Sequence, residues 1–163
     1  MSAPDSPGAG ERSGPDPGGT MGDAVEELLA HEEIRRCKAR YFRLMDEKRW
    51  DQWGEVFTTD VRMEVPEAEM VTEGREAVVA AVSGVLEGVR TVHHGHMPEI
   101  TLTGPDTADV IWAMEDYVEF PEAPDGTRVG LRGYGHYHET YRIEDGRWRI
   151  ASTKLVRLRI DAL

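Results

Sequence analysis

Three of the six histidines of this chain fall within four positions of one short segment, residues 92–100, as His93, His94 and His96. The unperturbed pKa of histidine lies close to physiological pH, so its imidazole suits proton transfer and metal binding better than any other side chain. The segment follows an apolar helical pattern and opens a run of long strand patterns. It is therefore the first candidate for a catalytic or metal-binding site.

Other side chains suited to a small-molecule pocket are expected around this segment. Tyr41 and Asp46 lie on one predicted helix, whereas Asp116, Tyr137 and Arg157 lie on three predicted strands. Asp116 shares a strand face with apolar residues only, namely Val110, Trp112, Met114, Val118 and Phe120. Because burying an unpaired charge is costly, we expect Asp116 to have a cationic or hydrogen-bonding partner.

A metal site is the alternative use of the histidines. The pairs His94/His96 and His136/His138 both have the His-x-His spacing, which puts the two rings on one face of a strand. Such pairs suit zinc or iron if the two strands are neighbours. His93 and His94 point to opposite faces, however, so a base at His93 and this metal would not share a pocket. Because His-x-His pairs on strands are also common by chance, we predict no metal site and no cofactor.

Composition bounds the class of protein. A length of 163 residues with 39% hydrophobic and 31% charged residues is typical of one ordinary globular domain. The net charge of -12 argues against nucleic acid as a partner, because phosphate binding needs a basic face. The single cysteine, Cys37, excludes an internal disulfide and fits a reducing cytoplasm. No apolar run approaches the ~20 residues of a membrane-spanning helix. We therefore expect a cytoplasmic protein with a small-molecule partner and no membrane contact.

Residues 1–22 are rich in glycine, proline and serine and show no apolar periodicity, so we predict a disordered tail. Met21 is an alternative start of translation. Residues 23–163 are expected to form a single domain. Its first predicted helix, residues 23–49, has Asp23 as N-cap and an apolar stripe that includes Tyr41. The polar residues His31, Glu32 and Glu33 indicate that its first turns are separate or exposed.

The remaining elements change from helical to strand periodicity along the chain. A short helix is predicted around Trp50, Trp53 and Phe57, and a third helix at residues 75–86, with two short strands between them at 62–65 and 70–72. Long strands follow at residues 90–102, with a bend or bulge at Pro98, and at 107–120, 128–143 and 147–160. This order predicts an α+β fold, in which three N-terminal helices pack in the concave face of a curved, mostly antiparallel sheet that forms a cone-like barrel.

Strand alternation groups the side chains of the last two strands by face. One face of the first carries Gly135, Tyr137, Glu139 and Tyr141. The last strand is expected to present Trp148, Ile150, Val156, Leu158 and Ile160 together. Arg157 then lies on the other face unless a bulge intervenes, and alternation alone leaves both placements open.

Four segments resemble the SnoaL-like branch of the nuclear transport factor 2-like superfamily. They are KARYFRLMD at 38–46 followed by Trp50 and Asp51, HHGHMPEIT at 93–101, WAMED at 112–116, and YHETY at 137–141 continuing through DGRW at 145–148 to Arg157. The resemblance covers about residues 24–160 and is closest to the bile-acid 7α-dehydratases and, more distantly, to scytalone dehydratase. It implies the cone-like fold and an oligomer, a homodimer or homotrimer.

The resemblance also implies roles for individual residues. The dehydratase tyrosine falls on Tyr41, its histidine on His93, and the aspartate that supports the histidine on Asp116. Further residues of the substrate pocket fall on Asp46, Trp112, Tyr137 and Arg157. The chain departs from the dehydratases at one position. They carry a second tyrosine near the end of the first strand, where this chain has Val65.

Together these roles predict a reaction class. A His–Asp pair is a suitable general base, and the Tyr41 hydroxyl can donate to an oxygen on which negative charge develops. The expected function is a cofactor-independent dehydratase or isomerase acting on a polycyclic or steroid-like hydroxy-ketone. Two alternatives remain: a non-catalytic ligand-binding domain, in which His93 and Asp116 are a structural pair, and the small subunit of a ring-hydroxylating dioxygenase. Aromatic and charged residues on the outer face of the sheet, such as Tyr117, His136 and His138, predict a subunit contact there.

Overall fold

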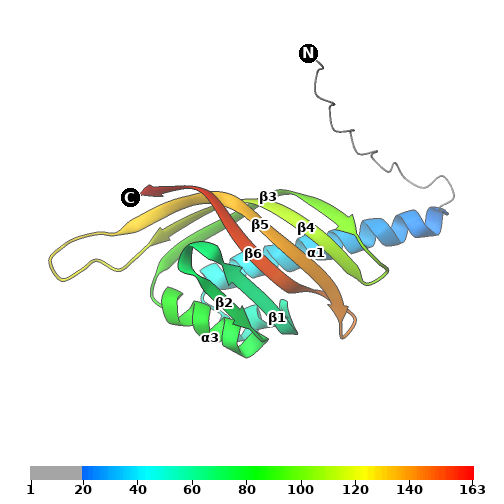
Figure 1. The fold of residues 1–163 in the computed structure, drawn as a ribbon, viewed down its shortest axis with the longest axis horizontal. Helices are drawn as coiled ribbons and strands as arrows, with labels where there is room; N and C mark the ends of the chain where they lie inside the picture. Colours follow the sequence, from blue (N-terminus) through cyan, green and yellow to red (C-terminus); the bar gives the residue numbers. More distant parts are fainter. Residues whose placement is uncertain (1–19) are drawn as a thin grey trace, which may run out of the picture.

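A curved sheet of six strands wraps over the C-terminal half of a long helix in the computed structural model, which describes residues 20–163 (Figure 1). The predicted tail falls on residues 1–22, of which 1–19 lie outside the described part. The helices are α1 (Met21–Asp46), α2 (Trp50–Gly54) and α3 (Arg75–Leu86), with a 3₁₀ turn, η1 (Pro66–Ala68). The strands are β1 (Phe57–Val65), β2 (Met70–Glu73), β3 (Arg90–Leu102), β4 (Thr107–Glu119), β5 (Gly130–Glu144) and β6 (Arg147–Ala162). The predicted α+β architecture is confirmed.

The sheet has the strand order β2-β1-β6-β5-β4-β3. Neighbouring strands are antiparallel, except that β1 runs parallel to β6. The predicted bulge at Pro98 is present, since the register between β3 and β4 shifts between Gly95 and Pro98. Phe57 belongs to β1 and not to the short helix predicted around it.

Helix α1 begins earlier than predicted and is only partly covered by the sheet. Its N-cap is Thr20, which forms a capping box with Asp23, so Asp23 is the third helical residue and not the cap. The first turns carry exposed apolar residues such as Leu28 and Leu29, as the polar interlude indicated. The buried stripe then recurs at helical spacing: Ile34, Cys37, Lys38, Tyr41, Phe42, Leu44 and Met45.

Strand β6 departs from simple alternation at two register shifts relative to β5. The first, beside Thr140 and Tyr141, moves Leu155 to the inner face in register with Tyr137. The prediction that Val156 and Leu158 share a face with Trp148 and Ile150 is therefore wrong. Arg157 lies in register with Gly135 on the same inner face, and the second shift then brings Ile160 into register with Gly133. Each extra residue changes which side chains point inward.

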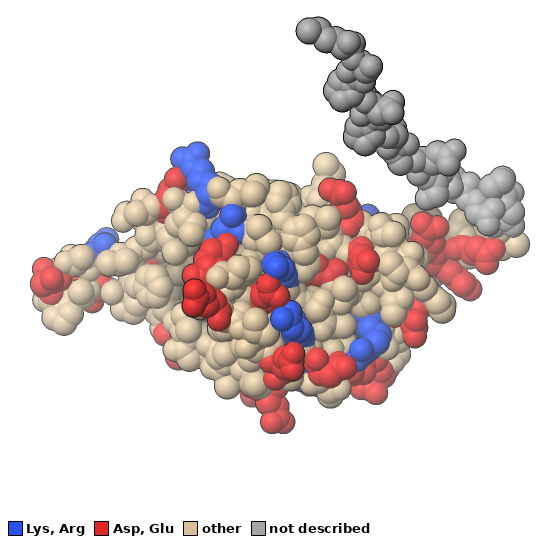
Figure 2. All heavy atoms as spheres, in the orientation of Figure 1, with Lys and Arg blue, Asp and Glu red and all other residues tan. Residues whose placement is uncertain are grey.

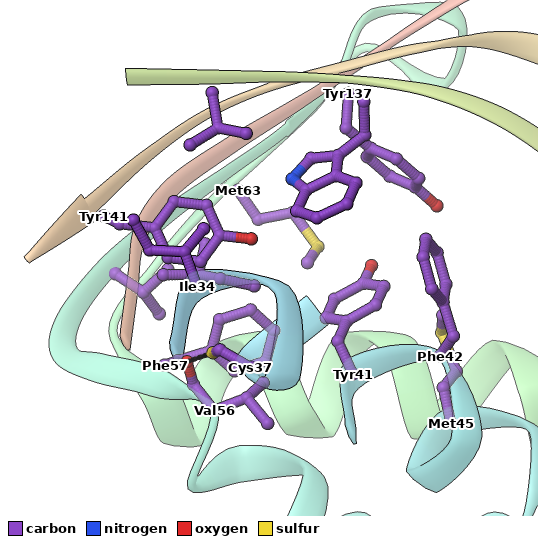
Figure 3. Packing of buried hydrophobic residues seen from close by; sticks show 14 of the residues in the cluster. Ile34, Cys37, Tyr41, Phe42, Met45, Val56, Phe57, Met63, Tyr137 and Tyr141 are labelled. Carbon is purple, nitrogen blue, oxygen red and sulfur yellow. Dashed lines mark hydrogen bonds between the residues drawn. The ribbon is translucent and has the colours of Figure 1, made fainter. Parts of the chain in front are cut away.

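Aromatic rings fill the space between α1 and the sheet (Figure 3). The ring of Tyr41 makes edge contacts with Phe57 and Tyr137, and its centroid lies 5.4 Å from that of Trp53. The sheet contributes Tyr137 and Tyr141, which are both buried. This layer joins the helix that carries Asp46 to the strands that carry the other candidate residues.

One ion pair lies inside this aromatic layer. Lys38 Nζ donates to Glu139 Oε1 at 2.6 Å, and both side chains are at most 1% exposed. The ammonium lies 4.0 Å from the ring centroid of Tyr41 and 3.7 Å from that of Tyr137, which is cation–π geometry. Glu139 also accepts hydrogen bonds from the Tyr141 hydroxyl at 2.7 Å and the Thr153 hydroxyl at 2.9 Å. The buried charge is therefore both paired and hydrogen-bonded.

Buried phenols make the fold sensitive to alkali. Burial raises the pKa of Tyr41, Tyr137 and Tyr141 above the usual 10.0, and raises that of the Cys37 thiol from 9.0 to about 12. These groups ionise first in the unfolded chain, so their stabilisation is complete below those ordinary values and is lost as the pH rises. The lowered pKa of Lys38 acts oppositely, but only below its ordinary 10.5.

We therefore expect the free energy of unfolding to decline above about pH 10, where the phenols outweigh Lys38. Once the Cys37 thiol and the three phenols are all ionised in the unfolded chain, it should fall by about 5.5 kcal/mol per pH unit, about 1.4 kcal/mol for each group. Urea denaturation at a series of pH values between 8 and 11.5 measures this slope. Tyr141→Phe should reduce the slope by about 1.4 kcal/mol per pH unit. A slope that Tyr141→Phe leaves unchanged would contradict the assignment of alkaline sensitivity to these groups.

The surface mixes charges of both signs. On the face drawn in Figure 2, basic side chains lie among more numerous acidic ones. None of the helices within residues 20–163 is both long and apolar enough to cross a membrane.

Candidate active site

His93 pairs with Asp46, which is the last residue of α1, and not with Asp116. His93 Nδ1 lies 2.6 Å from Asp46 Oδ1, and the backbone N–H of His93 donates to Asp46 Oδ2 at 2.9 Å. The carboxylate thus holds both the ring and the backbone of the histidine. The His93 side chain is 6% exposed and that of Asp46 is 23% exposed, so the pair is largely buried but keeps some contact with solvent.

The hydrogen-bond chain continues beyond Asp46. The Thr91 hydroxyl donates to Asp46 Oδ1 at 2.9 Å, and Lys48 Nζ donates to the Thr91 hydroxyl at 2.7 Å. Lys48 has a left-handed backbone, with φ of 58°, and directly follows Glu47, the C-cap of α1. Sequence reasoning missed both Thr91 and Lys48. The available signal for Thr91 was its place two residues before His93, on the same face of the strand.

Asp116 has the cationic partner that its burial required. Arg157 donates to its two oxygens through both terminal nitrogens, at 2.8 Å and 2.5 Å, and the Asp116 side chain is 2% exposed. Asp116 is in register with His93 across β3 and β4, so the two residues share the inner face as predicted. Asp116 was predicted to orient His93, and the geometry contradicts this. Asp46 contacts Nδ1 of the His93 ring, and Arg157 donates to both carboxylate oxygens of Asp116.

Gly133 makes room for the Asp116–Arg157 pair. It lies in register with Asp116 on β5, and a Cβ atom at this position would overlap both Asp116 Oδ1 and the Arg157 guanidinium. A side chain on β5 would therefore displace the bidentate pair. The glycine is part of the site although it carries no functional group.

Tyr41 and Tyr137 form an aromatic wall with Phe42. Phe42 stacks on His93 with centroids 6.4 Å apart and lies 5.4 Å from Tyr41 and 6.0 Å from Tyr137. In Figure 3 the Tyr41 hydroxyl points toward the sheet, on the side where Tyr137 lies. After burial itself, Tyr137, Glu139 and Asp116 raise the pKa of Tyr41, so Tyr41 stays a protonated donor at neutral pH.

Trp112 completes this wall from β4. It is in register with Tyr137, and it is buried. Gly95 on β3 keeps the wall close to α1, because a Cβ atom there would lie 2.5 Å from Phe42 Cε2 and 3.6 Å from Trp112 Cε3. The structure therefore brings Tyr41, Tyr137 and Trp112 into one aromatic layer, with Phe42 linking it to His93.

In the part of the chain that the structure describes, the histidine pairs suggested for a metal have no third potential ligand grouped with them. The rings of His136 and His138 lie 6.4 Å apart. Within residues 20–163, no three His, Cys, Asp or Glu side chains are grouped so that they could hold a metal ion. That the chain carries no metal stays a prediction for metal analysis of the purified protein.

The arrangement of this chain is shared by solved structures. A scytalone dehydratase-like protein from Novosphingobium aromaticivorans DSM 12444 has a TM-score of 0.75, with 20% identity, over 85% of this chain and 90% of its own. The hexachlorocyclohexane dehydrochlorinase LinA-type3 from Novosphingobium barchaimii LL02 has a TM-score of 0.74, with 15% identity, over 86% and 94%. At these identities the likeness establishes the fold, which is the nuclear transport factor 2-like α+β cone.

The sequence match is more specific than the fold. Residues 26–154 match the SnoaL-like domain, and the chain belongs to the SnoaL-like domain family. A probable cyclase of Gibberella zeae, FGR4, is 27% identical over 135 residues, which span 77% of this chain and 89% of the relative. The resemblance to that family is thereby confirmed, whereas the particular likeness to bile-acid 7α-dehydratases stays a prediction.

Proposed function

We propose that this protein is a cofactor-independent lyase or isomerase in which His93 is the general base. The observation that carries the proposal is the shielded His93–Asp46 pair. An Asp carboxylate at Nδ1 holds the ring in the tautomer whose Nε2 is free to accept a proton, and it stabilises the imidazolium that results. Within residues 20–163, no hydrogen bond is present at His93 Nε2, and this proposal assigns that atom to the substrate.

The other groups have complementary roles in this proposal. Tyr41 is a protonated donor for a carbonyl or a leaving hydroxyl, where negative charge develops. The bidentate Asp116–Arg157 pair, with Trp112 and Tyr137, would shape the pocket wall. Abstraction of a proton next to a carbonyl, followed by loss of water or by migration of the double bond, needs only such a base and such a donor.

The substrate class follows from the chemistry and the relatives. Aromatic walls suit a flat, mostly apolar molecule, and a base plus a donor suit a hydroxy-ketone. The relatives include proteins whose names indicate cyclisation, dehydration and dehydrochlorination, which are all reactions of small organic molecules. We therefore propose a polycyclic or steroid-like hydroxy-ketone as the substrate, and a homodimer or homotrimer as the working form.

The test is turnover of a panel of polycyclic hydroxy-ketones by the wild type and by His93→Gln. For the compound that is converted, His93→Gln should lower kcat by about 10²–10⁴, the usual contribution of a general base. Binding of the same compound, measured by calorimetry, should change little. Turnover that survives in a folded His93→Gln protein would exclude this base. Tight binding with no turnover of any compound by the wild type would favour the ligand-binding alternative.

A further inference from the structure

A groove of about 410 Å³ lies between α1, the α2–β1 connection and the β5–β6 hairpin, apart from the site described above. It shares no residue with the Asp46–His93 pair or the Asp116–Arg157 pair. Four arginines line it, namely Arg40, Arg43, Arg147 and Arg149, in a chain whose net charge is -12. Such a concentration of positive charge on an acidic protein needs an explanation.

Two of these arginines have no acidic partner in the part of the chain that the structure describes. Arg43 pairs with Glu47 at 2.8 Å, and Arg149 pairs with Glu55 at 3.1 Å. Arg40 and Arg147 are exposed and form neither an ion pair nor a side-chain hydrogen bond with any of residues 20–163. On the face shown in Figure 2, by contrast, basic side chains lie beside acidic ones.

The acidic residues of the groove do not compensate for this charge. Glu33 and Glu55 line it, but Glu33 Oε1 is bound by Arg36 at 2.9 Å and Glu55 Oε2 by Arg149 at 3.1 Å. Their charges are already matched by other cations. The guanidinium donors of Arg40 and Arg147 are therefore free for a ligand.

The floor of the groove is apolar and fixed. Leu44, Val56 and Trp148 line it and are at most 8% exposed. Arg149, with a side chain only 6% exposed, donates to the Glu55 carbonyl at 2.6 Å and so ties β6 to the segment that follows α2. A rigid apolar floor beneath free cationic donors is the usual design of a site for a small ligand.

We propose that this groove binds a small organic anion, namely a carboxylate carried on a flat apolar body. A planar guanidinium fork matches a carboxylate with two parallel hydrogen bonds, so Arg40 and Arg147 hold the charged end. The apolar body lies on Leu44, Val56 and Trp148. The volume is within the range of small-ligand sites.

Calorimetric titration with three probes at constant ionic strength tests the requirement for both parts of the ligand. The probes are 2-naphthoate, its uncharged analogue 2-naphthol, and inorganic phosphate, an anion without an apolar body. We expect 2-naphthoate to bind at least about 10-fold more tightly than either of the others, since a charged hydrogen bond and apolar contact both contribute. Equal affinity for naphthol or for phosphate would overturn the proposal.

Substitutions then locate the binding. Arg40→Gln and Arg147→Gln should each weaken 2-naphthoate binding by about 10-fold or more. Arg35→Gln is the matched control and should leave it unchanged, because Arg35 is an exposed arginine of α1 that also lacks an ion pair within residues 20–163 but does not line the groove. Arg40 and Arg147 are both exposed, so their replacement should preserve the fold. Loss of binding in His93→Gln with full binding in Arg40→Gln would assign the anion to the other site and refute the proposal.

Discussion

Replacing Lys38 with methionine is expected to lower the free energy of unfolding by about 3–5 kcal/mol. Methionine has a similar length and an apolar character, so the loss is not mainly one of packing. It arises because Glu139, with a side chain that is 0% exposed, keeps its negative charge without the ammonium 2.6 Å away. The hydroxyls of Tyr141 and Thr153 remain as donors but carry no compensating charge.

A double variant distinguishes the effect of the unpaired charge from the effect of altered packing. Lys38→Met combined with Glu139→Gln removes both charges and keeps an oxygen that can accept from Tyr141 or Thr153, so it should recover a large part of the stability lost in Lys38→Met alone. Urea denaturation of the single and double variants gives this coupling free energy. Lys154→Met is the control, because Lys154 forms a 2.7 Å ion pair with Glu64 in which the side chains are 47% and 22% exposed.

Lys154→Met should cost no more than about 1 kcal/mol, as is usual for an exposed ion pair. If Lys38→Met were as mild as this control, the buried pair would not be important for folding. A loss that the double variant fails to reduce would indicate that the methionine side chain packs badly instead.

Sequence reasoning predicted the fold because the determining patterns are local. The apolar stripe of α1 and the alternation along β4 are properties of neighbouring residues, so they are visible without tertiary contacts. The buried face of β4 follows that alternation from Ala108 to Val118. Periodicity also indicated that Asp116 would be buried and would need a partner, which the structure identifies as Arg157.

What the sequence could not predict depends on register and on long-range pairing. The inward placement of Arg157 follows from a β-bulge, which inserts one residue without a sequence signal of its own. The choice between Asp46 and Asp116 as partner of His93 depends on where α1 ends relative to β3, 47 residues away along the chain. Lys38 was read as part of a family motif, and nothing in helical spacing distinguishes a buried lysine from one that reaches solvent.

The two aspartates are expected to differ sharply when each is replaced by asparagine. Asp46→Asn should lower kcat/KM by about 10²–10⁴, because the amide no longer stabilises the imidazolium and can hold the ring in the wrong tautomer. A comparable exchange in Ser-His-Asp hydrolases costs about 10⁴ in kcat. The pH profile of kcat/KM should also move to lower pH, since the imidazolium loses its anionic partner.

Asp116→Asn should leave the position of that pH profile unchanged, because Asp116 is bound by Arg157 and not by the His93 ring. Its main effect should be a loss of stability of about 1–3 kcal/mol, the cost of leaving a buried partner group without its full hydrogen bonds. Measurement of kcat/KM between pH 5 and 9 for the wild type and both variants, with urea denaturation alongside, separates the two roles. A shift of the pH profile to lower pH in Asp116→Asn, without one in Asp46→Asn, would show that Asp116 and not Asp46 supports the base. The carboxylate that supports His93 must be the one whose replacement changes the pH profile.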